Sequence, residues 1–405
     1  MTLATGEPHC TDLRNAVRND PFPDAAGKVA RDRLLAELSS AVFASLPRAD
    51  QRRKGVMYLR GLLGAPGRKS VRNIAAFLGE QVNDQGLHHF VNDSTWAWEP
   101  MREALGRCLA RHAAPQACVL QPMTIPKSGT HSVGVGRTYS WESGKAVTAQ
   151  QVVGVWTASA AGTVPVNWRL HLPPCRPGEG GEAAPYGEGP LRETPEHSVV
   201  RAYRDTVARH RLPPGPVVLN GERLDGIAVA ARLRAAGATQ ISRIRQDTWL
   251  LPADPALPGW ADTPLPARRI ARLTRIGRHG MTLVTTGAPD VAELVATVRV
   301  RLPALPDASG RPRGIGDFVL FCTGPAGAQW PAELWLTDLS TADQAALLRL
   351  VCLGRGVETA GMRRAERVGI RDFVGRSFAG WHRHATLVSV AHAVVELAER
   401  AVPAP

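Results

Sequence analysis

The chain has 405 residues, enough for two or three domains, and its 44% hydrophobic and 21% charged residues are typical of a globular protein. Its six cysteines lie far apart and no apolar run reaches the ~18 residues of a membrane span, which excludes a disulfide framework, a zinc ribbon and a membrane protein and favours the cytoplasm. The net charge of +13 favours a polyanionic partner such as DNA, although five lysines among 49 basic residues also fit a GC-rich coding sequence.

The first predicted unit is a helical domain over residues 28–114, preceded by a flexible N-terminus over residues 1–27. Ser70 is a good N-cap for a short helix, and either Asn83 or Asp84 caps the next one. Two short helices around a tight turn are typical of a helix-turn-helix, which binds DNA. Apolar residues recur at helical spacing in four stretches, residues 28–48, 70–78, 83–91 and 99–112.

A group of polar and basic residues around this helix pair is predicted to contact the phosphates or base edges of double-stranded DNA. Lys127, in the turn "PKSG", has two interpretations of equal weight, a phosphate contact and a solvated turn lysine. The predicted contacts of the helix pair are Arg68, Lys69, Arg72, Asn83, Gln85 and His88.

Strand-like sequences begin at Cys118 and predict the first part of a mixed α/β core over residues 115–245. The proline-, glycine- and glutamate-rich residues 173–197 predict a mobile surface loop. Helical and strand patterns then alternate and end in a single strand over residues 239–251, and such a βαβ passage implies at least one parallel pair. Four closely spaced stretches predict an antiparallel meander, residues 118–120, 131–140, 150–159 and 164–173.

Residues 246–335 predict a β-rich insertion, in which strand-like stretches are separated by proline-rich connectors. Residues 336–405 predict a return to the core as C-terminal helices. A long helix begins at about Thr341, and the last one covers residues 386–401.

A three-stranded meander, a helix, a parallel strand and a late helix together follow the plan of the RNase H-like fold. Residues 52–174 and 354–392 resemble the insertion-sequence transposases of the DDE superfamily, whose nuclease core has this fold and carries a strand-rich insertion before the last catalytic helix. The stretches that carry the resemblance are "YLRGLL", "GLHHFVNDSTWAW", "PKSGTHSVGVGRTYS", "VNWRLHLP", "VVLNGERLDG" and "GRSFAGWHRHATLVSVAHA".

This resemblance implies a two-metal site, in which two aspartates and a glutamate hold two Mg²⁺ ions for attack on a phosphodiester. The chain departs from that pattern at most of the acidic positions. Gln121 and Pro122 stand where the family has an Asp-Asp pair, and Asn220 stands at its second essential Asp. Asn167 replaces the Asp before the "WRL" strand, which leaves Glu358 as the one retained candidate.

Amides bind hard divalent cations poorly, so Mg²⁺ binding is predicted to be weak or absent and strand transfer to be lost. Glu222 or Asp225, just past Asn220, could substitute for the lost acids, but their sequence offset favours the following turn. The exchange of acids for amides of similar size is typical of a chain that is still required to fold.

Three functions remain open at this point. The leading hypothesis is a domesticated, catalytically inactive transposase-like protein that binds DNA, as a transcriptional regulator for example. The second is metal-independent enzymology on a small molecule, bound in the old metal pocket by Gln121, Asn167, Asn220 and Glu358, with Glu358 as the general acid or base. The third is a transposase that is still active. A homodimer is compatible with each of them.

Overall fold

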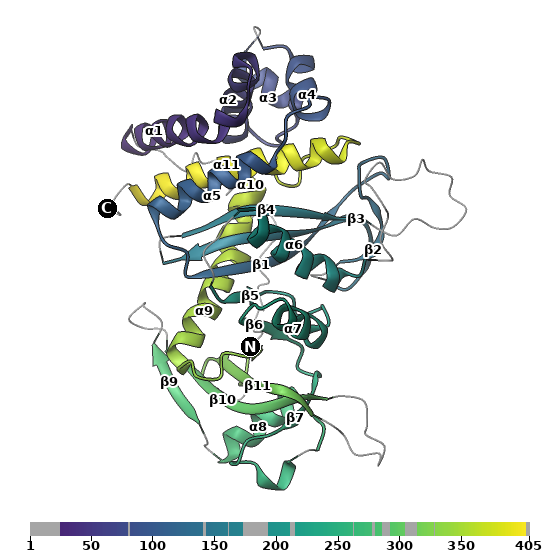
Figure 1. Cartoon of the computed structure of the whole chain (residues 1–405), viewed down its shortest axis with the longest axis vertical. Helices are drawn as coiled ribbons and strands as arrows, with labels where there is room; N and C mark the ends of the chain where they lie inside the picture. Colours follow the sequence, from purple (N-terminus) through teal and green to yellow (C-terminus); the bar gives the residue numbers. More distant parts are fainter. Residues whose placement is uncertain are drawn as a thin grey trace, which may run out of the picture.

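One mixed sheet organises the fold, so the predicted mixed α/β class is confirmed (Figure 1). The computed structural model describes residues 25–79, 82–140, 143–160, 162–172, 193–210, 215–261, 263–277, 280–285, 292–303, 314–327 and 329–401. Most of the predicted N-terminal extension and of the predicted surface loop lies outside these residues. Within them, 12 strands run in the order β2-β3-β1-β5-β6-β12-β11-β10-β7-β8, with β4 paired to β3 and β9 to β10.

The described residues before β1 fold mainly into helices, and the caps of the predicted helix pair are residues that the sequence indicates. The Ser70 side chain accepts a hydrogen bond from the Asn73 backbone N–H, and Asn83, rather than Asp84, caps the next helix through the Gln85 N–H. The packing of α2 on α3 is close, because a Cβ on Gly61 would lie 2.2 Å from Ile74 Cγ2. The helices are α1 (Ala25–Val42), α2 (Ala49–Gly64), α3 (Val71–Leu78), α4 (Asp84–Asn92) and α5 (Glu99–His112), with a 3₁₀ turn at Phe43–Ser45.

The core follows the expected RNase H-like plan. Strands β4, β3 and β1 are antiparallel neighbours, and β1, β5 and β6 are parallel neighbours. Two helices, α6 (Pro195–His210) and α7 (Gly226–Ala235), precede β5 and β6 respectively. The core strands are β1 (Ala117–Pro126), β3 (Ala146–Ser159), β4 (Gly162–His171), β5 (Val217–Leu219) and β6 (Gln240–Ile244).

Two strand predictions need correction. The expected strand over residues 131–140 is reduced to β2 (Gly136–Tyr139), because Gly134 has a φ of 69° and the preceding Val133 N–H donates to Gly375 O instead. The single strand expected over residues 239–251 is two strands, β6 and β7 (Trp249–Pro252), separated by a turn in which the Thr248 N–H donates to Arg245 O.

The insertion joins the core without leaving the sheet, because its last strand, β12, pairs antiparallel with β6. It also contains a helix that the sequence analysis does not predict, α8 (Ala267–Gly277), which buries Ile270, Ala271 and Thr274. The strands of the insertion are β7, β8 (Leu265–Pro266), β9 (Met281–Thr285), β10 (Ala292–Pro303), β11 (Gly314–Gly324) and β12 (Glu333–Thr337), with a 3₁₀ turn at Pro258–Trp260.

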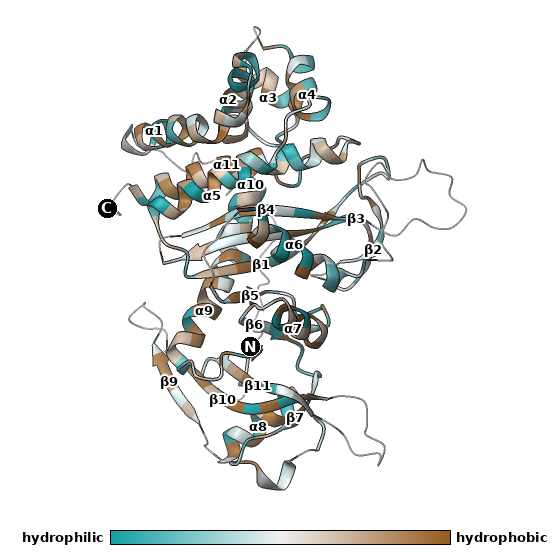
Figure 2. Ribbon diagram, viewed as in Figure 1, coloured by the Kyte–Doolittle hydropathy of each residue, from teal (hydrophilic) through white to brown (hydrophobic). Residues whose placement is uncertain are grey.

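The C-terminal helices pack on one face of the core sheet, opposite α6. Helix α9 (Gln344–Gly356), mainly apolar in Figure 2, continues through a π-helical turn, Val357–Gly361, into α10 (Met362–Arg367). Helix α11 (Phe378–Ala401) is buried between the sheet and the helical domain, and the Trp168 indole N–H of β4 donates to its Ser389 hydroxyl. Among the described residues, no helix combines the length and apolar character that a membrane span needs.

Candidate functional site

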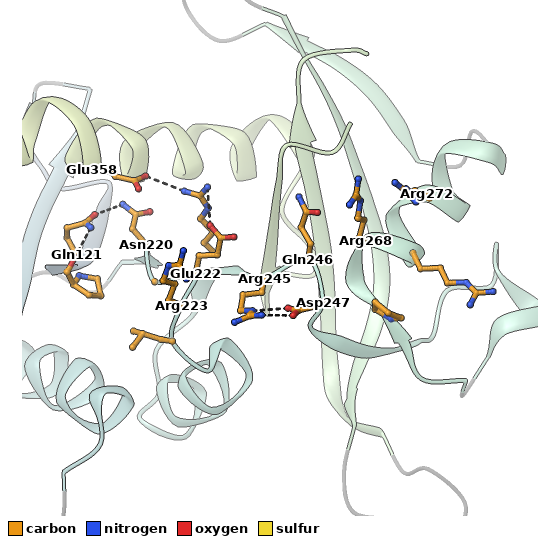
Figure 3. Close-up of a pocket in the computed structure, with 16 residues that line it drawn as sticks. Gln121, Asn220, Glu222, Arg223, Arg245, Gln246, Asp247, Arg268, Arg272 and Glu358 are labelled. Atoms are coloured by element: carbon orange, nitrogen blue, oxygen red, sulfur yellow. Dashed lines mark hydrogen bonds and ion pairs between the residues drawn. The ribbon is translucent and has the colours of Figure 1, made fainter. Parts of the chain in front are cut away.

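A cleft of about 1010 Å³ separates the core from the insertion, and we call it the central cleft (Figure 3). The core side contributes Gln121 of β1, Asn220 after β5 and Arg243 of β6. The insertion contributes Arg268 of α8, and the π-helical turn after α9 contributes Glu358. Strands β1, β5 and β6 are parallel, and the cleft lies next to Asn220, just past the carboxyl end of β5. Open α/β sheets bind their ligands at this end of their parallel strands.

Two amides occupy the positions where the resemblance indicates acids. Asn220 Nδ2 donates to Gln121 Oε1 at 2.9 Å and to Gly354 O at 2.7 Å, and Gln121 Nε2 donates to Pro122 O at 3.1 Å. Both residues are buried, since Gln121 is 8% exposed and Asn220 is 7% exposed. Asn220 Oδ1 is buried and has no hydrogen-bond partner among the described residues. The amides therefore bind each other and the backbone, as Figure 3 shows.

Gly354 allows α9 to approach this amide pair. A Cβ at this position would lie 2.8 Å from Val218 Cγ1 and 2.9 Å from Asn220 Oδ1, closer than side-chain carbons approach in folded proteins. The space that any side chain at position 354 would enter is therefore already filled by β5 and Asn220.

We expect the substitution Gly354→Ala to lower the free energy of unfolding by about 1–3 kcal/mol, because overpacking forces neighbouring groups to move. Gly356→Ala is the matched control, since the nearest atom to its Cβ is Thr163 Cγ2 at 4.0 Å. The control should leave stability unchanged or raise it by up to about 1 kcal/mol through helix propensity. Urea denaturation of both variants measures the difference, and equal stabilities would contradict close packing at Gly354.

Glu358, the one retained acid, is held by an arginine. It lies in the π-helical turn, a feature frequent at functional sites, and its side chain is 43% exposed. Its Oε2 is 3.4 Å from Arg243 Nη1. The same guanidinium lies 3.4 Å from Glu222 and 3.8 Å from Glu333. The single positive charge of Arg243 thus offsets part of the negative charge of these three carboxylates.

The donors at this site do not fit two Mg²⁺ ions. Gln121 Oε1 already accepts a hydrogen bond from Asn220, and the Arg243 guanidinium stands between Glu222 and Glu358. Asp225 does not replace a ligand, because its carboxylate caps α7 through the Ala228 N–H. In the part of the chain that the structure describes, no three His, Cys, Asp or Glu side chains are grouped for metal binding.

Arginine dominates the charge of the central cleft. Six arginines and three acids are among its lining residues. Arg245 pairs with Asp247, and Arg269 lies 4.9 Å from the centre of the Trp260 ring. Arg268 and Arg272 are exposed on one face of α8, and neither has an ion-pair partner within the described residues. Neither residue is among the predicted DNA contacts, although the apolar spacing of "ARRIARLTRIG" indicates a helix with a basic face.

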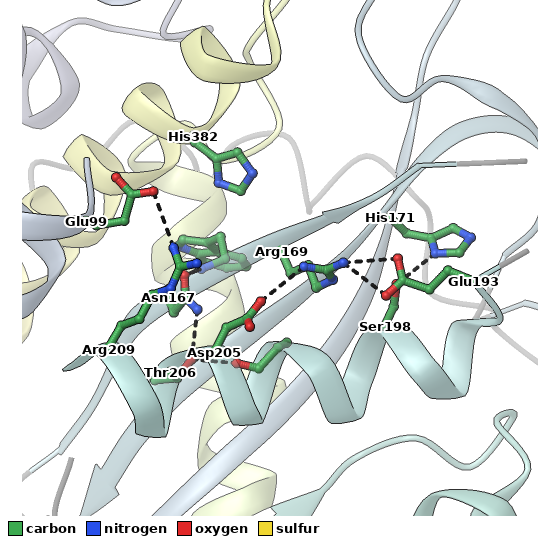
Figure 4. Close-up of polar contacts among 12 residues, drawn as sticks. Glu99, Asn167, Arg169, His171, Glu193, Ser198, Asp205, Thr206, Arg209 and His382 are labelled. Carbon is green, nitrogen blue, oxygen red and sulfur yellow. Dashed lines mark hydrogen bonds and ion pairs between the residues drawn. The ribbon is translucent and has the colours of Figure 1, made fainter. Parts of the chain in front are cut away.

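Asn167 does not line the central cleft, so its predicted place in the old metal pocket is wrong. Its Oδ1 accepts a hydrogen bond from Arg102 of α5, and its Nδ2 donates to the Thr206 hydroxyl of α6 at 2.7 Å. Figure 4 shows Asn167, Arg169 and His171 of β4 facing α6 and its N-terminal approach, as alternate residues of a strand share one face. Burial lowers the pKa of Arg102 to about 9, so this side chain stays charged at neutral pH.

Two lysines expected to contact DNA are held by the protein itself. Lys69 is buried, and its ammonium donates to Ala65 O. Lys127 donates to the carbonyls of Arg371 and Phe373 at 3.0 and 2.8 Å, and burial together with nearby arginines lowers its pKa to about 8. In this conformation neither ammonium is free for a phosphate.

The other predicted DNA contacts lie near the surface of the helical domain. Arg68 is exposed and 3.8 Å from Asp372, and Asn83 is occupied as the cap of α4. Lys69, Arg72, Gln85 and His88 line a cavity of about 420 Å³ between the helix pair and the segment before α11. The structure thus brings these four together, at a distance from Gln121, Asn220 and Glu358.

The comparisons with known proteins agree with this architecture. A family model described as DDE superfamily endonuclease matches residues 41–302, which include most of the helical domain, the core strands β1 to β6 and much of the insertion. Among curated proteins, none matches the sequence significantly.

Proposed function

Because the chain belongs to the DDE superfamily of endonucleases, we propose that it binds double-stranded DNA in the central cleft and does not cut it. The observation that carries this proposal is the amide pair of Gln121 and Asn220 in a cleft lined by six arginines. Arginines attract the phosphate backbone by a metal-independent, salt-sensitive interaction. On this proposal the protein is a domesticated transposase relative, suited to regulate transcription at sites that it occupies.

The state of the acids supports the loss of strand transfer. Two-metal catalysis needs carboxylates that clamp both ions on either side of the reacting phosphate. Here Glu358 interacts with Arg243, and Gln121 interacts with Asn220. The groups that remain can bind and orient a phosphodiester, but they lack a donor set for the ions that would activate water.

Anisotropy of labelled duplex DNA, taken from around the gene, tests the proposal across a salt series with Mg²⁺ or with a chelator. We expect tight binding that weakens steeply with salt, is the same with the chelator and leaves the DNA intact. Nicking that depends on Mg²⁺ or Mn²⁺ would instead identify an active nuclease.

Glu358→Gln gives the second check. We expect the affinity for duplex DNA to rise by about two- to fivefold at low salt, because the substitution removes a negative charge that faces the incoming phosphates. Glu103→Gln on α5 is the matched control, since Glu103 pairs with Arg107 outside the cleft. A loss of affinity in Glu358→Gln would argue for a ligand held by the carboxylate.

A second candidate function is metal-independent chemistry on a small molecule. The unpartnered Asn220 Oδ1 favours it, because a buried acceptor suits a ligand that donates an N–H or O–H. The anisotropy experiment separates the two functions. If the protein fails to bind duplex DNA at near-physiological salt, the small-molecule function becomes the leading one, with Glu358 as its general acid or base.

A further inference from the structure

The helical domain contains a second, separate recess. A groove of about 750 Å³ lies between α1 and α2, and Phe77 and Leu78 of α3 also line it. Its walls are one face of α1, from Arg31 to Ser40, and the facing side of α2, from Arg52 to Gly64. We call it the helical-domain groove. It lies on the opposite side of the core sheet from the insertion, so it is independent of the central cleft.

The floor of the groove is apolar. Leu35 and Phe43 are buried beneath it, and Val56 and Leu63 are half-buried along α2. Phe77 of α3 remains 47% exposed. Its ring lies against Gly64, where a Cβ would come within 2.4 Å of Phe77 Cζ. An aromatic ring that is seated on a glycine but open to solvent is a common anchor in protein–protein interfaces.

The rim of the groove is basic. The lining residues include four arginines and one acid, Asp32. Arg53 and Arg60 of α2 are exposed. Arg52 donates to Leu46 O, and Arg31 lies 3.9 Å from Asp32. Arg53 and Arg60 have no ion-pair partner in the described ranges. The unsatisfied charge on the rim is therefore positive.

We propose that the helical-domain groove binds an acidic amphipathic helix of a partner protein. The apolar face of such a helix would cover Val56, Leu63 and Phe77, and its acidic flank would pair with Arg53 and Arg60. DNA would satisfy the arginines but would leave the apolar floor without a partner. This interaction goes beyond the proposed DNA binding, because it gives the protein a means to recruit another protein.

A synthetic labelled peptide tests the proposal with the full-length chain. The peptide carries leucine and phenylalanine at positions i, i+3, i+4 and i+7 and glutamate elsewhere. We expect saturable binding that falls at least tenfold in the charge reversal Arg53→Glu with Arg60→Glu, and separately in Phe77→Ala. A scrambled peptide of the same composition, without the apolar stripe, should bind at least tenfold more weakly. Far-UV circular dichroism confirms that both variants are folded.

Several results would overturn the proposal. Equal binding of the scrambled peptide would reduce it to charge attraction, and unchanged affinity in Phe77→Ala would remove the apolar anchor. Weakened duplex binding in the Arg53 and Arg60 reversal, without loss of peptide binding, would make the groove a DNA surface. Self-association that Phe77→Ala abolishes would make it a homodimer contact. A gain in peptide affinity on deletion of residues 1–24 would identify that segment as the occupant.

The proposal can fail independently of the central cleft. The double reversal Arg268→Glu with Arg272→Glu should leave peptide binding unchanged, because both residues lie on α8 of the insertion. Peptide binding without DNA binding would support the groove and reject the proposed function. DNA binding without peptide binding would support the proposed function and reject the groove as a peptide site.

Discussion

Reversing the charge of Arg268 and Arg272 should lower the affinity for duplex DNA by about a hundredfold. Both side chains lie on one exposed face of α8, line the central cleft and have no ion-pair partner among the described residues. A charge-assisted contact contributes about 1.5–3 kcal/mol, so the loss of two corresponds to two or more decades in affinity. The slope of log affinity against log salt should decrease by about 2, since each lost phosphate contact removes about 0.9.

The matched control reverses Arg107 and Arg111, two exposed residues with the same i,i+4 spacing on α5, outside the cleft. The control should change the affinity less than about threefold, through long-range charge alone. Anisotropy at several salt concentrations measures both affinity and slope. If the two double variants weaken binding equally, DNA does not occupy the central cleft, and the exposed Arg68 and Arg72 of the helical domain become the next residues to test.

The protein should lose several kcal/mol of stability between pH 7 and pH 5. Burial lowers the pKa of His384 to about 4 and that of His392 to about 3, and it lowers the pKa of His382 in the same direction. The unfolded chain, with a His pKa near 6.5, therefore takes up protons that the folded chain does not. The stabilising contribution of these neutral histidines is fully present well above pH 6.5 and decreases as the pH falls. At pH 5 the free energy of unfolding is lower by about 2 kcal/mol for each of His384 and His392.

The hydrogen bonds explain why these rings resist protonation. His384 Nε2–H donates to Gly369 O at 2.9 Å, and its Nδ1 accepts from the Tyr58 hydroxyl at 2.9 Å. A proton on Nδ1 would force the Tyr58 hydroxyl to turn from donor to acceptor. His392 Nε2–H donates to Gly361 O at 3.2 Å, and its Nδ1 is buried without a hydrogen-bond partner among the described residues.

Urea denaturation at pH 7 and pH 5, followed by circular dichroism, measures the effect. In His384→Gln the loss between the two pH values should be about 2 kcal/mol smaller, because this position can no longer take up a proton. His131→Gln, at an exposed histidine, should show the same pH dependence as the unmodified chain. Equal losses in all three proteins would contradict a role for His384.

Local signals in the sequence predict much of the fold. The caps at Ser70 and Asn83 act as their chemistry indicates, and the order of strands and helices leads to the RNase H-like plan. Helix α8 is not among the predicted elements, because its buried stripe of Ile270, Ala271 and Thr274 is short and lies between several arginines. The sequence therefore predicts the elements of the core better than it predicts α8, which forms the opposite wall of the central cleft.

The candidate site could be predicted only in part, because its decisive contacts join distant segments. Gln121 and Asn220 do meet, 99 residues apart, but Asn167 faces α5 and α6. Its position follows a bulge at which the β3–β4 register shifts, and no sequence pattern reveals such a shift. Likewise, Lys69 is buried against the segment that contains Asp372, 303 residues later in the chain.

The pairing of β6 with β12 has a mechanical consequence. Residues 241–244 are paired with residues 334–337, so the strands of the core and those of the insertion belong to one hydrogen-bonded sheet. Arg355 of α9 reinforces this connection through ion pairs with Glu293 of β10 and Glu333 of β12. We therefore expect the core and the insertion to move together rather than about a hinge. A cleft whose width stays constant would admit only molecules whose cross-section fits it.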